Sequence, residues 1–184
     1  MNDNGKRLND NELVRRLRVV PDFPVKGIQF FDVTTLFKDA DAFEELVTRI
    51  CDCYKDKGIT KVAGIESRGF ITGAAVAARL GAGFVPIRKP GKLPADTFSE
   101  SYSKEYGTDS IEIHTDAIGQ DDVVLVHDDL LATGGTAAAA IRLVKKFAPK
   151  KVYAKFIINL TDVPRTSPHP DDVEVCSLLK LSER

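Results

Sequence analysis

The sequence predicts an α/β fold in which a central, mostly parallel sheet is flanked by helices. Short apolar segments rich in β-branched residues alternate along the chain with longer segments of helical periodicity. The chain has 184 residues, of which 43% are hydrophobic and 29% are charged, as in ordinary globular proteins. This length suits one sizeable core, so we expect a single domain over residues 1–184.

The N-terminal third is expected to hold two helices around a short apolar segment. Leucines four residues apart predict a short helix over Asn9 to Val20. Residues 27–32 form the apolar segment. A long helix follows, because apolar residues recur there at spacings of three and four. Asp41 is its predicted N-cap and Gly58 its predicted end.

Strands and helices are expected to alternate over the rest of the chain. The predicted strands are Lys61 to Ile65, Gly83 to Ile87, Val123 to Val126, Lys151 to Leu160 and a short edge strand, Val173 to Leu179. The predicted helices are Phe70 to Leu80 and Thr136 to Phe147. Since ligands of such sheets bind beyond the carboxyl ends of the strands, the loops that follow the strands are the candidate sites.

Residues Lys89 to Thr108 fit neither the helical nor the strand period. They are rich in Gly, Pro, Ser, Lys and Tyr, and a stretch of this length inside a compact domain is often a functional lid. A lid is therefore expected here, with a plain surface hairpin as the alternative.

Charge and cysteine content limit the possible partners and location. The formal net charge of −1 excludes bulk attraction to nucleic acid or to an anionic membrane. Cys51 and Cys53 stand two apart on a predicted helix, which is poor geometry for a disulfide or a zinc site, and Cys176 stands alone. The N-terminal residues are polar and no apolar stretch suits a membrane span. We expect reduced thiols and a cytoplasmic location.

The most informative segment is VVLVHDDLLATGGT, residues 123–136. A buried strand leads into Asp128 and Asp129, and a tight loop then leads into a helix near Thr136. Glycines at a helix N-terminus let backbone N–H groups approach a phosphate closely. Two adjacent carboxylates can accept hydrogen bonds from the vicinal hydroxyls of a sugar, and they favour a divalent cation. Phosphate, diol and metal together indicate a ribose 5-phosphate group.

Two better-known phosphate motifs are excluded by spacing. The segment lacks the Gly-Lys-Ser/Thr of a P-loop and the Gly-x-Gly-x-x-Gly of a dinucleotide fold. The plain alternative is an ordinary N-cap turn preceded by solvated acids. A buried strand and paired acids directly before the turn argue against that alternative.

DDLLATGGT closely resembles the phosphoribosyl-diphosphate-binding motif of type I phosphoribosyltransferases, in the wording of the branch that uses adenine. PDFPVKGI, GIESRGF, IRKPGKLP and SYSKEYG resemble further motifs of that family, in the same order, between about Val20 and Lys146. The resemblance implies a type I phosphoribosyltransferase fold with a small N-terminal hood over about residues 1–35. It also implies a mobile lid over about residues 89–108, a homodimer and a requirement for Mg²⁺.

The resemblance also implies how the activated sugar is bound. The ribose phosphate would lie on Asp128, Asp129, Ala132, Thr133, Gly134, Gly135 and Thr136. The diphosphate would be held by Ser67, Arg68, Arg88 and Lys92, with Tyr106 closing over it. Magnesium would be held mainly by the substrate, with no direct side-chain ligand. Water-mediated contacts to Asp128 and Asp129 are left open.

Catalysis and base binding are assigned to the lid and the hood by the same resemblance. Glu105 is expected to manage the proton of the incoming base, and Arg68 is the second expected catalytic residue. The base-binding residues would be Gln29, Phe30, Phe31 and Leu130, with Phe30 and Leu130 on the two faces of the ring and backbone groups of the other two at its edge. Phe30 as plain core is the alternative.

Three positions depart from the family pattern: His127, Phe31 and Pro90. His127 replaces an aliphatic residue and is expected to be a neutral, hydrogen-bonded core group. Phe31 and Pro90 stand where basic residues are common in this branch, which affects details of base and diphosphate contacts.

The predicted activity is transfer of a 5-phosphoribosyl group from 5-phospho-α-D-ribose 1-diphosphate to adenine, which gives AMP and diphosphate in purine salvage. The first alternative is the same reaction on hypoxanthine, guanine, xanthine or orotate. The second is a regulator that binds the donor without chemistry. A purely structural module would leave the acid pair and two glycine loops unexplained. The expected partners are therefore these small-molecule substrates and a second copy of the chain.

Overall fold

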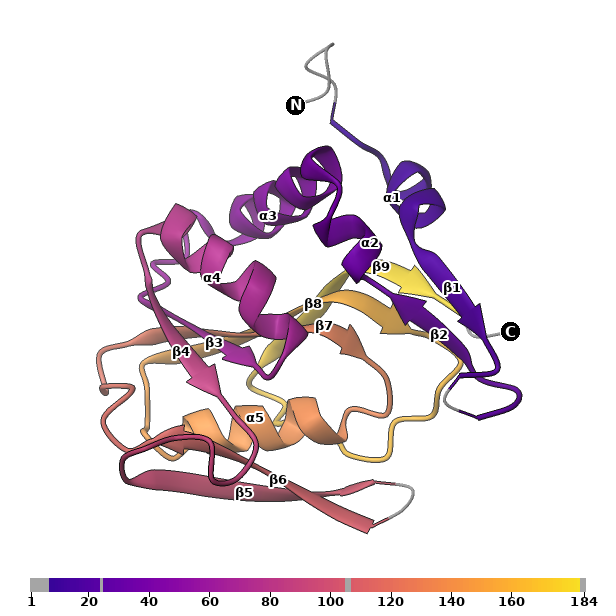
Figure 1. Cartoon of the computed structure of the whole chain (residues 1–184). Helices are drawn as coiled ribbons and strands as arrows, with labels where there is room; N and C mark the ends of the chain where they lie inside the picture. Colours follow the sequence, from indigo (N-terminus) through magenta and orange to yellow (C-terminus); the bar gives the residue numbers. More distant parts are fainter. Residues whose placement is uncertain (1–6, 24, 105–106, 183–184) are drawn as a thin grey trace.

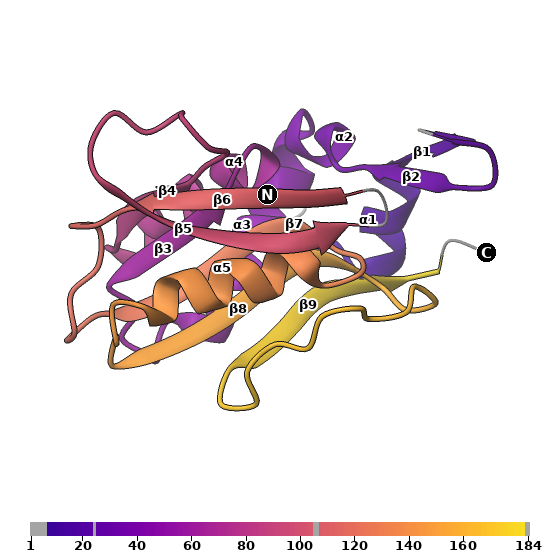
Figure 2. The same ribbon diagram turned by 90° about the horizontal axis from the view of Figure 1, so that it is seen from below.

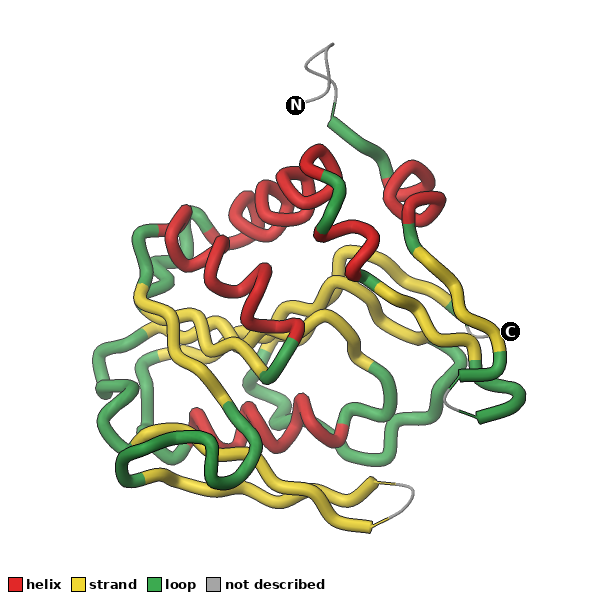
Figure 3. The backbone as a smooth tube through the Cα atoms, viewed as in Figure 1, coloured by secondary structure: helices red, strands yellow, loops and turns green. Residues whose placement is uncertain are grey.

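One five-stranded parallel sheet forms the centre of the molecule (Figure 1). The computed structural model describes residues 7–23, 25–104 and 107–182. The strand order is β4-β3-β7-β8-β9. The strands are β3 (Lys61–Ile65), β4 (Gly83–Ile87), β7 (Val123–Leu131), β8 (Lys151–Leu160) and β9 (Glu174–Leu181). The predicted α/β class with a mainly parallel sheet is confirmed. Figure 3 shows how helices and strands alternate along the chain.

Helices cover both faces of the sheet. The helices α3 (Ala40–Tyr54) and α4 (Arg68–Leu80) lie on one face, and α5 (Gly135–Lys145) lies on the other (Figure 1). The antiparallel hairpin of β5 (Thr97–Lys104) and β6 (Gly107–His114) packs over the outer side of α5 (Figure 2). The sheet is thus buried on both sides, which explains why its strands read as continuous apolar runs.

The order of the strands reverses between β3 and β7. From β3 the chain steps outward to β4 on one side, and from β7 it steps to β8 and β9 on the other. The two strands are parallel neighbours, with Gly64 opposite His127 in the register. A crevice opens at such a reversal, beyond the carboxyl ends of the strands. The loop after β3 and the end of β7 therefore meet there.

The N-terminal residues form a separate small layer against one end of the sheet. It consists of α1 (Asp10–Arg16), β1 (Arg18–Pro21), β2 (Gln29–Asp32) and α2 (Thr34–Phe37), with β1 and β2 antiparallel. Leu13, Phe31 and Leu36 pack in one cluster with Ile158 of β8 and Leu179 of β9. This contact places the β1–β2 ribbon beside the carboxyl ends of the central strands.

The predicted end of the first helix is wrong. The helix expected over Asn9 to Val20 begins after Asn9, which forms a capping box, but it ends at Arg16. Val19 and Val20 lie in β1 and pair with β2, since β-branched residues gain cross-strand packing that helical propensity does not supply. The short helix α2 was not predicted.

The long helix α3 also has different ends from those expected. Asp39, not Asp41, is its N-cap, and the Asp39 carboxylate accepts a hydrogen bond from the Ala42 N–H at 3.0 Å. Asp41 lies in the first turn. The helix ends at Tyr54, and Gly58 occupies a left-handed turn with φ 65° after it. Both carboxylates suit the positive end of a helix, so sequence alone could not separate them.

The remaining differences concern strand lengths and the expected lid. Residues 97–104 and 107–114 are the strands of a hairpin, whereas residues 89–108 were expected to follow neither the helical nor the strand period. β7 continues past Val126 to Leu131, so the acid pair lies on the strand and not after it. The last strand begins at Glu174 and reaches Leu181, and α5 spans Gly135–Lys145. Over the described residues, every helix is too short or too polar to cross a lipid bilayer.

The first turn of α4 touches the backbone of β7 at Gly69. A Cβ at Gly69 would lie 2.8 Å from the carbonyl oxygen of His127 and 3.2 Å from Asp128 Cα. Both obstacles are backbone atoms of a buried strand, which cannot rotate away. Only glycine therefore permits this approach.

We predict that Gly69→Ala lowers the free energy of unfolding by about 1 to 3 kcal/mol, because the steric overlap outweighs the gain of about 1 kcal/mol that alanine brings to a helix. Gly119→Ala is the matched control, since the nearest atom to its added Cβ would be Asp122 Oδ2 at 3.6 Å. Urea unfolding of both variants gives the comparison. Equal stability of the two variants would mean that α4 can move away from β7.

His127 is a fully buried polar residue in the centre of the sheet. Its Nδ1–H donates to the carbonyl oxygen of Lys155 at 2.8 Å, and the Thr72 hydroxyl donates to its Nε2 at 2.6 Å. Since a carbonyl only accepts, these bonds fix the neutral tautomer with its proton on Nδ1. Burial lowers the pKa of His127 to about 4. The predicted neutral core histidine is therefore confirmed.

Because the folded-state pKa of His127 lies below its unfolded value of 6.5, the unfolded chain binds more protons between these two pH values. This group should cost the fold about 3 kcal/mol as the pH falls from 7 to 4. We predict that His127→Gln, which cannot titrate there, loses about 3 kcal/mol less over that interval than the unmodified protein. If the free energies of unfolding of the two proteins fell by the same amount between pH 7 and pH 4, a buried neutral imidazole would be contradicted.

Candidate phosphoribosyl site

A cradle of backbone N–H groups lies at the N-terminus of α5, beyond the end of β7. Gly134, with φ 87°, turns the chain into the helix and is its N-cap. The cavity at this turn has a volume of about 220 Å³ and is lined by Arg68 and residues 128–137. Predicted residues Ala132, Thr133, Gly134, Gly135 and Thr136 all lie on it. The helix end supplies unpaired donors and a partial positive charge, so it suits a phosphate.

The acid pair borders the same cavity. Asp128 is partly exposed, whereas Asp129 retains 3% of its surface. Burial of its carboxyl group, together with the adjacent charge of Asp129, raises the pKa of Asp128 well above its usual value. The Asp128 carboxylate also accepts a hydrogen bond from the Asp129 N–H at 2.9 Å. A diol or a cation at this point would offset the repulsion between the two carboxylates.

Arg68 connects the loop after β3 with the acid pair. Its Nε lies 2.6 Å from Asp129 Oδ2, an ion pair without the angle of a directed hydrogen bond. Its guanidinium carbon lies 5.3 Å from the ring centroid of Phe30. The terminal nitrogens of Arg68 have no hydrogen-bond partner within residues 7–23, 25–104 and 107–182. They are therefore available to an anion in the cavity.

Ser67 stands at the start of α4 and is exposed. The peptide bond between Glu66 and Ser67 is cis. The Ser67 side chain makes no capping hydrogen bond to its own helix. Its hydroxyl group thus faces solvent beside Arg68, in keeping with the predicted role.

Glu66 was not recognised from the sequence, yet it joins the two predicted diphosphate segments. Its carboxylate accepts from Arg88 Nε and Nη2, both at 3.2 Å, and from the Lys89 N–H at 3.0 Å. These bonds, with that from Arg88 the largest cause, lower the pKa of Glu66. Arg88 is thus oriented by Glu66 and donates further to the Lys92 carbonyl at 3.1 Å. No local signal in GIESRGF distinguishes this glutamate from a surface one.

In the basic segment after β4, Lys89 is paired with other side chains, whereas Lys92 is exposed to solvent. Lys89 pairs with Asp109 and donates to the Tyr102 hydroxyl at 3.1 Å, so its charge is committed to the hairpin. Lys92 is exposed in the turn, as is Pro90. Lys92 therefore remains the better placed of the two lysines for an incoming anion.

The residues predicted to bind the base lie on two elements. Phe30 and Phe31 point to opposite sides of β2, as alternation along a strand requires. Phe31 is 8% exposed and packs in the core, whereas Phe30 is partly exposed and meets Phe23 edge-on with centroids 5.2 Å apart. Phe30 is therefore not plain core. Gln29 is exposed, and Leu130 lines the cradle.

A segment after β8 supports the cradle from behind and was missed by sequence reasoning. The Thr166 N–H donates to the Thr133 carbonyl at 3.0 Å. Arg165 donates to the Leu131 carbonyl at 3.2 Å and also to Asn159 Oδ1. Ser167 lies so close that a Cβ on Gly134 would be 3.2 Å from its carbonyl oxygen. These contacts join residues far apart in the chain, so spacing could not reveal them.

The two predicted lid residues, Glu105 and Tyr106, fall outside the described residues. They stand between the last residue of β5, Lys104, and the first residue of β6, Gly107. Within the described part of the chain, no group of three or more His, Cys, Asp or Glu side chains could hold a metal ion.

Comparison with known proteins agrees with this geometry. Residues 33–178 match the model of the phosphoribosyl transferase domain. An adenine phosphoribosyltransferase of Bacteroides thetaiotaomicron is 60% identical over 174 residues, which cover 95% of this chain and 99% of that protein.

Solved structures show the same agreement. A crystal structure of adenine phosphoribosyltransferase from Rhodothermus marinus matches with a TM-score of 0.87 and 47% identity, covering 93% of this chain and 97% of that one. The enzyme from Giardia lamblia, complexed with 9-deazaadenine, matches with a TM-score of 0.84 and 36% identity, covering 95% and 98%. The chain therefore belongs to the phosphoribosyltransferase family, in the branch whose members are named adenine phosphoribosyltransferases.

Proposed function

We propose that this protein transfers the 5-phosphoribosyl group of 5-phospho-α-D-ribose 1-diphosphate to N9 of adenine, with release of diphosphate and formation of AMP. The cradle at the start of α5, open and bordered by the acid pair, is the observation that carries the proposal. It joins a phosphate site to a pair of diol acceptors, as a ribose 5-phosphate requires.

The donor would bind across the reversal of strand order. The 5-phosphate would accept hydrogen bonds from the backbone of residues 132–136 and from the hydroxyls of Thr133 and Thr136. The ribose hydroxyls would donate to Asp128 and Asp129. The diphosphate would then lie toward Ser67, Arg68, Arg88 and Lys92.

Arg68 is proposed to act on the leaving group while its Nε stays paired with Asp129. A guanidinium has five N–H donors, so its terminal nitrogens can bind two diphosphate oxygens at once. As the bond from C1 to the diphosphate weakens, negative charge grows on those oxygens and Arg68 stabilises it. The ion pair with Asp129 holds the long Arg68 side chain in this position.

Burial of the carboxyl group and, after it, the adjacent charge of Asp129 raise the pKa of Asp128. Mg²⁺ fits the paired carboxylates, because a cation beside them would offset the repulsion between the two charges. When bound by the donor, it would neutralise charge on the diphosphate and ribose oxygens. Asp128 and Asp129 are proposed to contact it through water. The donor would hold most of the coordination of the Mg²⁺ ion, and the side chains would not bind it directly.

The β5–β6 hairpin is proposed to act as the lid, with Tyr106 closing over the diphosphate. Its exclusion of water would prevent hydrolysis of the activated sugar. Glu105 is proposed to receive the proton that adenine loses as N9 attacks C1. Adenine would stack between Phe30 and Leu130 and meet backbone groups of Gln29 and Phe31. Since the Arg68 guanidinium covers the Phe30 ring, the base must use the other face or displace it.

Other features are proposed on the same basis: a homodimer and a cytoplasmic location. The runner-up activity is the same transfer to hypoxanthine, guanine, xanthine or orotate. A donor-binding regulator without catalysis is the other alternative. The favoured base follows from the names of the relatives, so it requires a direct test.

We expect product analysis of the purified protein with donor, Mg²⁺ and each of the five bases to give a nucleoside monophosphate from adenine alone at an appreciable rate. Omission of Mg²⁺ is expected to abolish turnover. A faster reaction with another base would reassign the substrate. Donor binding without any product would support the regulator.

Arg68→Ala is predicted to lower kcat about 100- to 1,000-fold, the typical loss for one well-placed donor to developing charge. Glu105→Ala is predicted to lower kcat about 100-fold or more, as expected for loss of a general base. Circular dichroism should show both variants folded. Near-normal turnover of a folded Glu105→Ala variant would remove Glu105 from its proposed role.

Arg165 is proposed as a positioning residue for the cradle. Arg165→Gln should raise KM for the donor roughly fivefold, as loss of about 1 kcal/mol of hydrogen bonding implies, with little change in kcat or in KM for adenine. Lys150→Gln, an exposed change at the opposite end of β8, is the control. Equal changes in both KM values would indicate a general loss of structure instead.

A further inference from the structure

The side chain of a buried lysine, Lys155, lies within 4 Å of two cysteine thiols that the proposed function does not use. Lys155 of β8 retains only 4% of its surface. Its ammonium lies 3.6 Å from Cys176 Sγ and 3.8 Å from Cys53 Sγ, and it donates to the Ser177 carbonyl at 3.4 Å. In the described ranges no carboxylate lies within ion-pair distance of it. A buried ammonium is costly unless an anion compensates it, and the thiols are the groups placed to do so.

A second donor converges on Cys176. The hydroxyl of Tyr54 lies 3.4 Å from Cys176 Sγ. Burial raises the pKa of Tyr54 strongly, so its phenol keeps its proton and can donate to the sulfur. The carboxylate nearest in sequence, Glu174, is engaged by Lys57 at 3.1 Å. A sulfur that faces a cation and a hydroxyl donor has the environment of a reactive thiolate.

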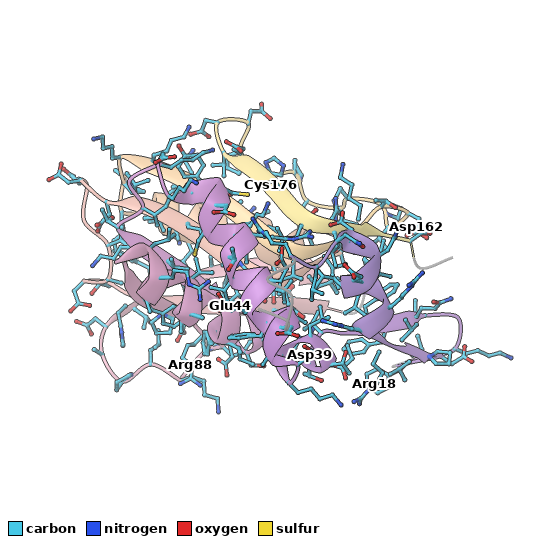
Figure 4. The ribbon with its side chains drawn as sticks, turned by 90° about the horizontal axis from the view of Figure 1, so that it is seen from above. Arg18, Asp39, Glu44, Arg88, Asp162 and Cys176 are labelled. Carbon is cyan, nitrogen blue, oxygen red and sulfur yellow. The ribbon has the colours of Figure 1, made fainter. Side chains whose placement is uncertain are left out.

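The two thiols come from different elements that meet at this point. Cys53 is exposed near the end of α3, and Cys176 is partly exposed near the start of β9, beside that helix (Figure 4). Both sulfurs lie within 4 Å of the same nitrogen, at 3.8 and 3.6 Å, so they are at most 7.4 Å apart. Cys51, two residues before Cys53, is buried, and burial raises its pKa. Cys51 therefore serves as an unreactive internal reference.

We propose that Cys176, Cys53 and Lys155 form a peroxide-reactive site that closes to a disulfide between Cys176 and Cys53. The Cys176 thiolate attacks the terminal oxygen of a hydroperoxide, the O–O bond breaks, and the departing oxygen takes a proton. Cys176 is then a sulfenic acid. The Cys53 thiol attacks that sulfur, the S–O bond breaks and water leaves. In total two thiols give up two electrons and two protons, and one hydrogen peroxide becomes two waters.

The test uses the full chain and hydrogen peroxide. Non-reducing peptide mass spectrometry should show Cys53 and Cys176 joined within one chain, with loss of two hydrogen atoms, and dithiothreitol should reverse it. In Cys53→Ser, the sulfenic acid should persist on Cys176 and be captured by dimedone. If dimedone instead labelled Cys53 in the Cys176→Ser variant, Cys53 would be the thiol that attacks the peroxide, and the proposed order of attack would be reversed. Absence of the intrachain link would overturn the proposal.

The role of the ammonium is tested by alkylation with iodoacetamide at pH 7. Cys176 of the unmodified protein should react at least about tenfold faster than buried Cys51, as expected for an accessible thiolate beside a cation. Lys155→Met should slow the alkylation of Cys176, whereas Lys151→Met, an exposed change on the same strand, should not. Equal rates at Cys176 and Cys51 in the unmodified protein would refute the thiolate, even if Lys155→Met failed to fold.

Discussion

The ion pair between Arg68 and Asp129 is the contact on which the site depends. It joins the first residue of α4 to the end of β7, across the point where the strand order reverses. Without Arg68, two adjacent carboxylates would face each other in a poorly hydrated crevice with no fixed cation nearby. With it, Asp129 has a fixed cation as its partner, and Arg68 lines the same cavity as the cradle.

This contact requires that α4 approach β7 very closely, and the backbone is shaped to allow it. A side chain at Gly69 would meet the backbone of the strand, so glycine at this position permits the approach. His127 satisfies its polar atoms inside the sheet through Thr72 of α4 and the backbone of β8. The hydrogen bonds of this histidine thus tie α4 to the two central strands directly beneath the acid pair. A rigid base of this kind keeps charges in place where a flexible loop would not.

The sequence predicted the parts of this arrangement that depend on local chemistry. Periodicity located the strands Lys61–Ile65, Gly83–Ile87 and Lys151–Leu160 correctly, because apolar residues dominate each of them. The glycine turn and acid pair were found because their spacing carries a mechanism. Glu66 and Arg165 were missed, since their partners lie far away in the chain. The first strand of the N-terminal ribbon was taken for the end of a helix, because its valines gain strand partners only in the folded molecule.

The hairpin illustrates why secondary structure and function can be confused in a sequence. Residues 89–108 fitted neither the helical nor the strand period and were therefore expected to form a lid, yet residues 97–104 form a strand, and a lid can be built as a hairpin. β5 is held to α5 by Glu100, which pairs with Arg142 at 2.8 Å and with Lys146 at 2.9 Å. The same helix presents the cradle at its other end. The hairpin is thereby fixed to the element that would bind the phosphate. A hairpin held in this way lies beside the cradle helix, so the strand pairing is compatible with a lid at this position.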